Sequence, residues 1–386
     1  MHAKITATQK DNRPVRSRAP ERTAESSDLH FAGGDSTPRF RMPAEWEPHA
    51  ATWIAWPHNE EDWPGKFEPI PWVYAEIVRH LGGVEHVHII VQDADLERSA
   101  RKVLKLANAP LSNVSFHRWP TDRVWTRDSG PIFVKNSSNG QRAILNWRFN
   151  AWAKYSNWKQ DNQLPSRIAS KLKVEEITPA ISSDGDTLQP LVLEGGSIDV
   201  NGCGAMLTTE ECLLSDVQQR NPGVSREELE MVFAALLGAR KVIWLGNGIA
   251  GDDTHGHIDD LARFVAPDSV VTIVERDPAD VNYAPLQDNL KRLRSATDQD
   301  GKRLRVIELP MPSPVVFEGR RLPASYANFY IANGLVLVPV FNDQNDRVAL
   351  NTLAEVFPKR KVVGIYSGDF IWGFGALHCM TQQEPK

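Results

Sequence analysis

The chain has 386 residues, of which 41% are hydrophobic and 24% charged, as is typical of a globular protein with a sizeable core. No run approaches the ~20 apolar residues of a membrane span, and the net charge of −5 favours a cationic small molecule over a nucleic acid as partner. Cys203, Cys212 and Cys379 form no CxxC pair, which argues against a disulfide framework and favours a reducing, cytoplasmic compartment.

The first 40 residues differ in composition from the rest of the chain. They are polar, mixed in charge and nearly free of large apolar residues before Phe31. The segment lacks the apolar region of a secretory signal, and its acidic residues argue against an organelle transit peptide. We therefore predict a disordered leader over residues 1–40 and a single folded domain over residues 41–386.

Hairpin signals recur at a nearly fixed interval beyond this leader. Turn dipeptides between alternating apolar runs stand at Asn139-Gly140, Asn201-Gly202, Pro267-Asp268 and Asn333-Gly334. Their first residues are 62, 66 and 66 positions apart. A fixed period of this length indicates a repeat architecture, either a solenoid or a propeller.

Helical patterns follow the hairpins with the same period. We expect helices to begin near Ala94, Asp161, Ser225, Asn282 and Asp346. Ser225 with Glu228 forms a capping box, and Gly238 is placed to end that helix. Short apolar strands come next, with the sequences "VSFHRW", "KVIWLG", "RVIELP" and "KVVGIYS". The unit is therefore predicted to be hairpin, helix and strand, repeated about five times.

The number of interior hairpins is one fewer than the number of helices. Pairing "AATWIAWP" near the start with "ALHCMTQQ" at the end would supply the fifth hairpin and close the repeats into a ring. The fold class we expect is an α/β propeller, and Cys379 would lie on its closing strand. His378 would then face away from Cys379, because neighbouring residues of a strand point to opposite faces.

Unusual polar residues stand where each hairpin begins. Asp128, Glu194, His257, Asp259 and Cys379 occupy equivalent places, so they would meet around the axis of a propeller. Cys379 could act as a thiol nucleophile, with His257 as general acid and base. Carboxylates repel a thiolate unless the substrate is a cation, and a guanidinium presents donors that carboxylates match in pairs. The sequence thus predicts a site for a small cationic guanidino substrate.

Seven stretches of the chain resemble the agmatine deiminase and bacterial peptidyl-arginine deiminase family of the pentein superfamily. They are "WPHNEEDWPGKF", "VWTRDSGPIFV", "LVLEGGSIDV", "LTTEECLL", "KVIWLGNGIAGDDTHGHIDDLARF", "SYANFYIANG" and "LHCMTQQ". Together with their surroundings they extend over nearly all of residues 43–383. The resemblance implies a five-bladed α/β propeller of ββαβ modules, and an enzyme that hydrolyses C–N bonds.

The same resemblance implies a role for each residue at the hairpin starts. Cys379 would be the nucleophile and His257 the acid and base, while Asp128 and Asp259 would clamp the guanidinium. Glu194 would bind substrate or support the histidine. The implied reaction passes through a covalent thiouronium and converts agmatine to N-carbamoylputrescine and ammonia, with no metal and no organic cofactor.

Residues beside these motifs are candidates for contacts with the rest of the substrate. Trp125, Trp152 and Trp372 are placed to flank a cation by cation–π contact. The acidic cluster of Asp252 and Asp253 favours agmatine, whose distal end is an amine, over arginine, whose distal end also carries a carboxylate.

The chain departs from the common family pattern in two places. His255 stands where many members have an acidic or amide residue, and we expect it at the rim of the pocket. Trp372 and Phe374 stand where many members have a glycine-rich run. Neither departure touches the nucleophile, the base or the clamp, so they bear on the identity of the substrate and not on the type of reaction.

Three alternatives remain open from the sequence. The same chemistry would serve a deiminase of free arginine or of peptidyl-arginine. The pair His255 and His257 suggests a metal-dependent hydrolase, although only His378 follows to complete a ligand set. A non-catalytic guanidinium-binding protein is disfavoured because nucleophile, base and clamp are all present. We interpret Cys203 and Cys212 as structural, and a homodimer is compatible with exposed edges between the repeats.

Overall fold

The computed structural model describes residues 4–9, 38–182 and 188–386 of the chain. Within these ranges no helix is both long and apolar enough to span a membrane. The described residues form an α/β fold in which short sheets alternate with helices along the chain.

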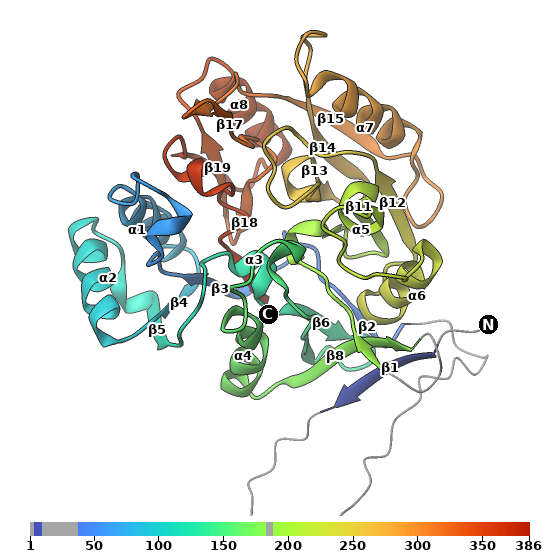
Figure 1. Cartoon of the computed structure of the whole chain (residues 1–386), viewed down its shortest axis with the longest axis horizontal. Helices are drawn as coiled ribbons and strands as arrows, with labels where there is room; N and C mark the ends of the chain where they lie inside the picture. The colour runs from blue at the N-terminus through green and yellow to red at the C-terminus, as the bar shows by residue number, and fades with distance from the viewer. Residues whose placement is uncertain (1–3, 10–37, 183–187) are drawn as a thin grey trace, which may run out of the picture.

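One structural pattern occurs five times among the described residues. Two antiparallel strands are followed by a helix and by a third strand that lies parallel to the second. Figure 1 shows these modules set around the middle of the molecule, with their helices toward the outside. The modules consist of β21 (Gln382–Pro385), β3 (His49–Ala55), α1 (Ile70–Leu81) and β4 (His86–Val91); β6 (Ile132–Asn136), β7 (Arg142–Leu145), α4 (Leu164–Leu172) and β8 (Glu175–Ser182); β10 (Asp199–Val200), β11 (Ala205–Thr209), α6 (Arg226–Leu237) and β12 (Lys241–Leu245); β13 (Ala262–Ala266), β14 (Ser269–Val274), α7 (Tyr283–Ser295) and β15 (Arg305–Pro310); and β18 (Tyr330–Ala332), β19 (Leu335–Val340), α8 (Asp346–Val356) and β20 (Lys361–Tyr366).

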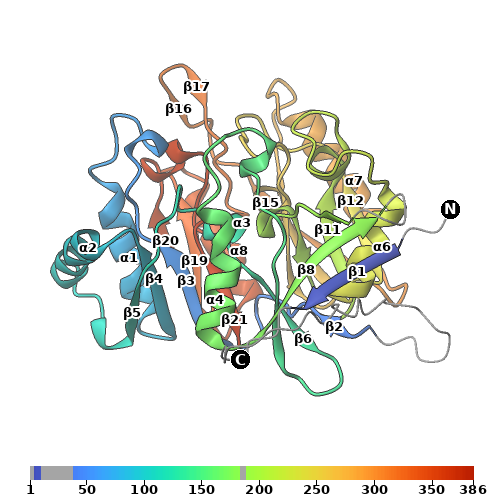
Figure 2. The same ribbon diagram turned by 60° about the horizontal axis from the view of Figure 1, so that its bottom comes forward.

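Further elements are attached to this repeated framework. They are β1 (Lys4–Gln9), β2 (Phe40–Arg41) and β9 (Gln189–Pro190) on the sheet of β6, α2 (Ala94–Leu106) and β5 (Val114–Arg118) beyond β4, the hairpin β16 (Val316–Phe317) and β17 (Arg320–Arg321), and the short helices α3 (Thr126–Ser129) and α5 (Glu210–Leu214). Figure 2 shows the β16–β17 hairpin projecting from the body of the molecule.

The four interior hairpins predicted from turn dipeptides are confirmed. Each pairs its two strands antiparallel across the expected turn. Gly140, Gly202 and Gly334 have φ values of 70°, 71° and 69°, a left-handed conformation that glycine adopts without steric cost. The Asn-Gly signal therefore identified three of these turns through the backbone conformation that each one needs.

The predicted helix starts are largely confirmed, but one helix was missed. α6 begins at Arg226 with the capping box of Ser225 and Glu228 and ends at Gly238, which has φ 70°. α1 (Ile70–Leu81) was not predicted, although Ile70, Tyr74, Ile77, Val78 and Leu81 form a buried stripe at helical spacing. Because α1 joins β3 to β4, the helix predicted at Ala94 is an addition to the first module and not its repeat helix.

The two ends of the folded chain pair with each other, as predicted. Gln382 lies opposite Trp53 in the antiparallel β21–β3 pair, and the Lys386 N–H donates to the Pro48 carbonyl at 2.8 Å. The prediction that Cys379 lies on this strand is wrong, because β21 begins only at Gln382 and Cys379 occupies the preceding turn. The Thr381 N–H bonds to the His378 carbonyl at 3.1 Å, so the turn satisfies its own backbone before the strand starts.

The leader expected over residues 1–40 contains two strands. β1 pairs antiparallel with the edge of β8 from Lys4 opposite Ser182 to Gln9 opposite Ile177, and β2 pairs with β6. The disordered leader and its boundary at residue 40 stay predictions. Residues 1–3 and 10–37 of the predicted leader lie outside the described ranges.

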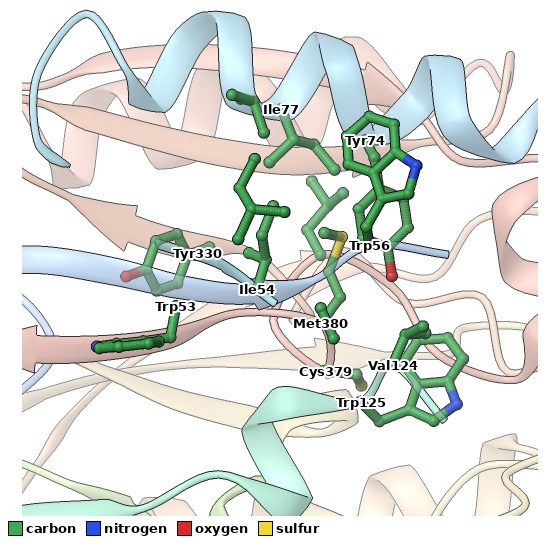
Figure 3. Close-up of a cluster of buried hydrophobic side chains, with 14 of the residues drawn as sticks. Trp53, Ile54, Trp56, Tyr74, Ile77, Val124, Trp125, Tyr330, Cys379 and Met380 are labelled. Carbon is green, nitrogen blue, oxygen red and sulfur yellow. The ribbon is translucent and has the colours of Figure 1, made fainter. Parts of the chain in front are cut away.

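A buried aromatic cluster connects the core of the first module to the polar centre of the molecule. Trp53, Trp56 and Tyr74 are at most 2% exposed; the rings of Trp56 and Tyr74 meet edge to face at 5.9 Å, whereas Trp53 stacks on His88 of β4 at 4.0 Å. Figure 3 shows Trp125 and Cys379 side by side at the border of this cluster. The thiol is thus held against a rigid, close-packed core on one side.

Deleting residues 382–386 should leave β3 with an unpaired edge and remove four buried residues from the core. We expect a loss of several kcal/mol in the free energy of unfolding and poor recovery of folded protein. Thermal unfolding followed by circular dichroism measures the change. Deleting only the exposed Lys386 is the control and should cost far less; an equally stable shorter chain would contradict a structural role for the β21–β3 pair.

Candidate active site

Five short segments meet at the centre of the described structure, and each one directly precedes the first strand of a module. They are α3, Glu194 with the 3-10 turn η5 (Gly195–Ser197), His257 with the 3-10 turn η6 (Ile258–Asp260), residues 325–329, and the turn 377–381. Hydrogen bonds join neighbouring segments, from the Gly196 N–H to Asp128, from Ser325 Oγ to the Asp260 carbonyl, from the His378 N–H to Asn328, and from the Arg127 N–H to the Cys379 carbonyl. The structure thereby brings together Asp128, Glu194, His257, Asp259 and Cys379.

Asp128 is fixed by two donors from different segments. Its Oδ1 accepts from the Gly196 N–H at 3.0 Å and its Oδ2 accepts from Trp152 Nε1 at 2.9 Å. Burial raises the pKa of Asp128 to about 6, with His257 opposing the shift and the carboxylate of Asp259 adding to it. The carboxylate is therefore held in one orientation and becomes more stable in its charged form when a cation binds beside it.

Trp152 reaches Asp128 from a backbone turn of unusual conformation. Ala151, Trp152 and Ala153 have φ values of 50°, 58° and 54°, a left-handed conformation that costs roughly 1–2 kcal/mol for each residue with a Cβ. The Asn150 side chain stabilises the turn by accepting from the Ala153 N–H at 2.9 Å. Such strain persists where the surroundings fix the conformation, and here it aims the indole at the Asp128 carboxylate.

His257 is surrounded by carboxylates without being hydrogen-bonded to any of them. Its Nδ1 lies 3.8 Å from Asp128 and 3.9 Å from Asp259, and its Nε2 lies 4.0 Å from Glu194. Burial alone would lower the pKa of His257, but Asp128, then Cys212 and Asp259, outweigh burial and hold the pKa well above its usual value. The ring is therefore protonated near neutral pH and is poised to donate a proton.

Cys379 lies at the floor of the cavity with its thiol between an amide and a carboxylate. Its Sγ accepts from Asn328 Nδ2 at 3.1 Å and lies 3.7 Å from Asp259 Oδ2. Burial raises the pKa of the Cys379 thiol well above its usual value, and the carboxylates of Asp259 and Asp260 raise it further. The thiol is thus neutral in the empty site, and a bound cation is needed to favour the thiolate.

A buried ion network that the sequence did not reveal lies behind Cys379 and is centred on Glu45. His378 joins the two sides, with Nδ1 2.7 Å from Asp259 and Nε2 2.7 Å from Glu45. Glu45 also contacts Arg127 at 3.1 Å and Arg263 at 3.0 Å. Burial would favour protonated Glu45, but Arg263, His378 and Arg127 hold its pKa well below the usual range.

Glu194 is oriented by a buried arginine. Arg220 Nε donates to Glu194 Oε1 at 3.0 Å, and the guanidinium is itself held by the carbonyls of Gln218 and Thr254. Glu194 Oε2 has no hydrogen-bond partner among the described residues and faces His257. The arrangement leaves one carboxylate oxygen free for a ligand or a water at the ring.

A cavity of about 470 Å³ opens onto Cys379 and Asp128. Its walls are formed by Glu61, Asp62, Arg123, Trp125, Asp128, Trp152, Tyr155, Ser156, Asn157, Asp253, Thr254, Gly373, Phe374, Gly375 and Cys379. Trp125, Trp152 and Asp253 thus line the cavity where the sequence placed substrate contacts. Asp253 is also paired with Lys154 at 2.6 Å and with Arg320 at 3.3 Å.

Four expected substrate contacts are not among the lining residues, namely Glu194, His255, Asp259 and Trp372. Trp372 packs against Phe317 and donates to the Pro64 carbonyl at 3.0 Å, and its neighbour Phe374 reaches the cavity instead. His255 lies 3.2 Å from Ser215 Oγ and points away from the ring of His257, so the two histidines do not converge on one ligand position. The backbone is left-handed at His255 (φ 65°) and at Phe374 (φ 64°). A prediction that lets successive side chains point to opposite faces does not anticipate this conformation.

Several site residues were missed or undervalued from the sequence. Glu45 and Arg220 carried no motif, and both act through a partner far away in the chain. Asn328 lies in "SYANF", which opens a hairpin like the other site segments and so carried a usable signal. His378 was expected to face away from Cys379 because a strand was assumed, whereas the turn directs it to Asp259.

Gly196 lies where a side chain would collide with both His257 and Asp128. A Cβ there would lie 2.6 Å from His257 Nδ1 and 2.7 Å from Asp128 Oδ1. Gly196→Ala should therefore displace both groups and lower turnover by about 10²-fold or more while the protein still folds. Gly83→Ala is the control, since its Cβ would meet no atom closer than 3.4 Å; similar activity of both variants would contradict this account of the site.

Glu45→Gln should lower the free energy of unfolding by about 3–5 kcal/mol, because buried arginines lose the charge that compensates them. Urea unfolding followed by circular dichroism measures the loss. Glu47→Gln is the matched control, because its pair with Arg41 is partly exposed and should contribute less than about 1 kcal/mol. Equal losses in the two variants would show that Glu45 is not central to stability.

Comparisons with known proteins agree over the whole length of the folded chain. The sequence profile of a family described as Porphyromonas-type peptidyl-arginine deiminase matches residues 41–385. A Selenomonas ruminantium protein provisionally named agmatine deiminase is 38% identical over 91% of this chain and 98% of its own length.

Solved structures are also similar to this chain over more than nine tenths of its length. A structure described as the agmatine deiminase of Enterococcus faecalis catalysing its reaction has a TM-score of 0.81 and 33% identity, covering 91% of this chain and 98% of its own. A cysteine-to-serine variant of the C. jejuni agmatine deiminase with substrate bound has a TM-score of 0.79 and 31% identity, covering 93% of this chain and 99% of its own. The likeness therefore includes every module and not one motif alone.

Proposed function

The chain belongs to the Porphyromonas-type peptidyl-arginine deiminase family, and from this membership we propose that it is an agmatine deiminase, which hydrolyses agmatine to N-carbamoylputrescine and ammonia. The observation that carries the proposal is the clustering of Cys379, His257, Asp128 and Asp259 beside a cavity whose wall includes Cys379 and Asp128. A thiol nucleophile, a protonated imidazole and a carboxylate pair are the groups that displacement of ammonia from a guanidinium requires.

The proposal extends to the architecture and the setting of the protein. We propose that the five modules are the blades of a five-bladed propeller, whose ends are joined by the β21–β3 pair. The three cysteines are all free thiols, which suits a reducing cytoplasm. A homodimer remains a prediction from the sequence.

In the first half of the proposed reaction the guanidinium lies between Asp128 and Asp259. Its positive charge offsets the two carboxylates that raise the pKa of Cys379, so the thiol releases its proton to solvent through the cavity and the thiolate attacks the guanidinium carbon. An S–C bond forms, and protonated His257 gives its proton to the departing amino group. The C–N bond then breaks, ammonia leaves, and a thiouronium remains on Cys379.

In the second half a water molecule replaces ammonia. Neutral His257 takes a proton from this water, whose oxygen attacks the thiouronium carbon. The C–S bond breaks, the thiolate is released, and the ureido product retains the oxygen. Glu194 Oε2, 4.0 Å from His257 Nε2 and otherwise unpartnered among the described residues, can hold the water beside the ring.

The charge around the cavity favours a substrate with a second positive charge. Glu61, Asp62 and Asp253 line it together with Asp128, and Arg123 is the one basic residue on its wall within the described ranges. Agmatine carries an amine where arginine also carries a carboxylate. Asp252 makes no contribution, because it turns to the N–H groups of Thr254 and Gly256. Arg123 is ion-paired with Asp62, and it is the group that a carboxylate of arginine would meet.

Ammonia release from agmatine, free arginine and a blocked arginine peptide tests the proposal directly. The purified protein is assayed after chelator treatment, and each ureido product is identified by mass. Ammonia from agmatine alone, unaffected by chelator, is the expected result. Turnover of arginine in place of agmatine would overturn the substrate, and loss of activity to chelator would overturn the thiol mechanism.

Cys379→Ala should abolish ammonia release while agmatine still binds, because the clamp carboxylates remain. Cys203→Ala is the matched control, because Cys203 is exposed on a turn far from the cavity and its loss should leave turnover unchanged. Near-normal activity of Cys379→Ala would contradict a covalent intermediate on this residue.

The ratio kcat/KM for agmatine should fall as the pH is lowered through about 6. The pKa of Asp128 is raised to about 6. In the free protein this carboxylate therefore takes up a proton as the pH falls through about 6, and it loses the charge that holds the guanidinium. A pH–rate profile checks this, and the acid limb should disappear from any residual activity of Asp128→Asn. A profile that stays flat down to pH 5 would contradict the assignment.

A further inference from the structure

A second cysteine, Cys212, lies beside His257, the acid and base of the proposed reaction. Cys212 belongs to α5 and is fully buried, with its N–H bonded to Thr209 Oγ1 at 3.0 Å. Atoms of Glu194, Cys212 and His257 that can ligate a metal all lie within 4.8 Å of one another. The deiminase reaction proposed above uses Glu194 and His257 but gives the Cys212 thiol no task.

These three side chains offer unsatisfied ligand atoms toward one another. Glu194 Oε2 and both ring nitrogens of His257 have no hydrogen-bond partner among the described residues, although all three atoms are buried. An unpaired buried polar atom costs free energy, so a group that satisfies several of them at once would be stabilised there. A thiol, an imidazole and a carboxylate together are a typical ligand set for Zn²⁺.

The surroundings resemble the outer shell of a metal site. Arg220 bonds to Glu194 Oε1 at 3.0 Å and leaves Oε2 free, as outer partners of ligating carboxylates do. Oxygen atoms of Asp128 and Asp259 lie 3.8 Å and 3.9 Å from His257 Nδ1. The carboxylates of Asp128, Asp259 and Glu194 outnumber the positive charges of Arg220 and the His257 imidazolium, and a divalent cation in place of the imidazolium proton would reduce this negative excess.

We propose that Glu194, Cys212 and His257 form a binding site for a thiophilic divalent cation such as Zn²⁺, and that occupancy of the site switches the enzyme off. The cation would displace the proton of the Cys212 thiol and one proton of the His257 imidazolium, both of which pass to solvent, and bind the thiolate, the carboxylate and the freed ring nitrogen, with no change of oxidation state. His257 as a ligand can no longer deliver a proton to the leaving amine. The inhibitory effect rests on the proposed function, whereas binding of the cation does not.

The substrate cavity is the side from which a cation would approach the site. Asp128 and Cys379 line the cavity, and Asp128 Oδ1 is 3.8 Å from the His257 ring. A cation that enters the cavity would meet this carboxylate first and the imidazole next. Bound substrate, which is itself a cation held by Asp128, would exclude the metal electrostatically, so metal and agmatine should compete.

Binding of Co²⁺ tests the site without any assay of activity, because a cobalt–thiolate bond gives a charge-transfer absorption band. The full-length Cys379→Ala variant removes the nucleophile as a competing ligand and should still bind one Co²⁺ with this band. Adding Cys212→Ser should abolish the band, whereas adding Cys203→Ser, the control at an exposed cysteine, should leave it. A band that survives Cys212→Ser, or none in Cys379→Ala, would overturn the proposal.

Two further measurements keep the test decisive. If Cys379→Ala with Cys212→Ser fails to fold by circular dichroism, Glu194→Gln in the Cys379→Ala background replaces it and should weaken Co²⁺ binding at least about tenfold. Unchanged affinity would overturn the proposal. In the active protein, the Zn²⁺ concentration that halves turnover should rise at least about tenfold in Cys212→Ser, relative to its own metal-free rate. Equal sensitivity of the two proteins to Zn²⁺ would place the inhibitory metal elsewhere. The Co²⁺ measurements do not depend on agmatine being the substrate, so they test the binding site separately from the proposed function.

Discussion

The structure depends on one buried carboxylate, that of Glu45. It accepts from the Ile331 N–H at 2.8 Å and from His378 at 2.7 Å, and it contacts Arg127 and Arg263. Its partners belong to four of the five segments or modules that meet at the centre. A buried charge is tolerated only when it is paired and hydrogen-bonded, so these segments must be in place together for Glu45 to be stable.

The same constraint explains the state of the empty site. Through His378 the network orients Asp259, which lies 3.7 Å from the Cys379 sulfur. Carboxylates on this side, and Asp128 on the other, keep the thiol neutral and the imidazole of His257 charged. The site is therefore suited to a cation, and the Cys379 thiol ionises more easily when a cation fills it. This protects a buried thiol from unrelated electrophiles.

The sequence predicted those parts of the molecule that depend on local backbone chemistry. Asn-Gly turns, the Ser225 capping box and the period of the repeats identified four hairpins and most helices. The position of Asp128, Glu194 and His257 before hairpins anticipated their meeting, because equivalent positions of repeats converge. The turn at Cys379, the left-handed residues His255 and Phe374, and the partners of Glu45 and Arg220 could not be anticipated in this way. Each depends on contacts between segments more than 25 positions apart or on a backbone conformation that alternation of side chains does not encode.

The antiparallel pair of β21 with β3 has a consequence for the order of folding. Gln382 lies opposite Trp53, although most of the described chain separates these two residues. Bringing such distant segments together costs conformational entropy before any contact compensates for it. The first module is therefore expected to be completed late in folding, after the four modules whose strands are neighbours in the sequence.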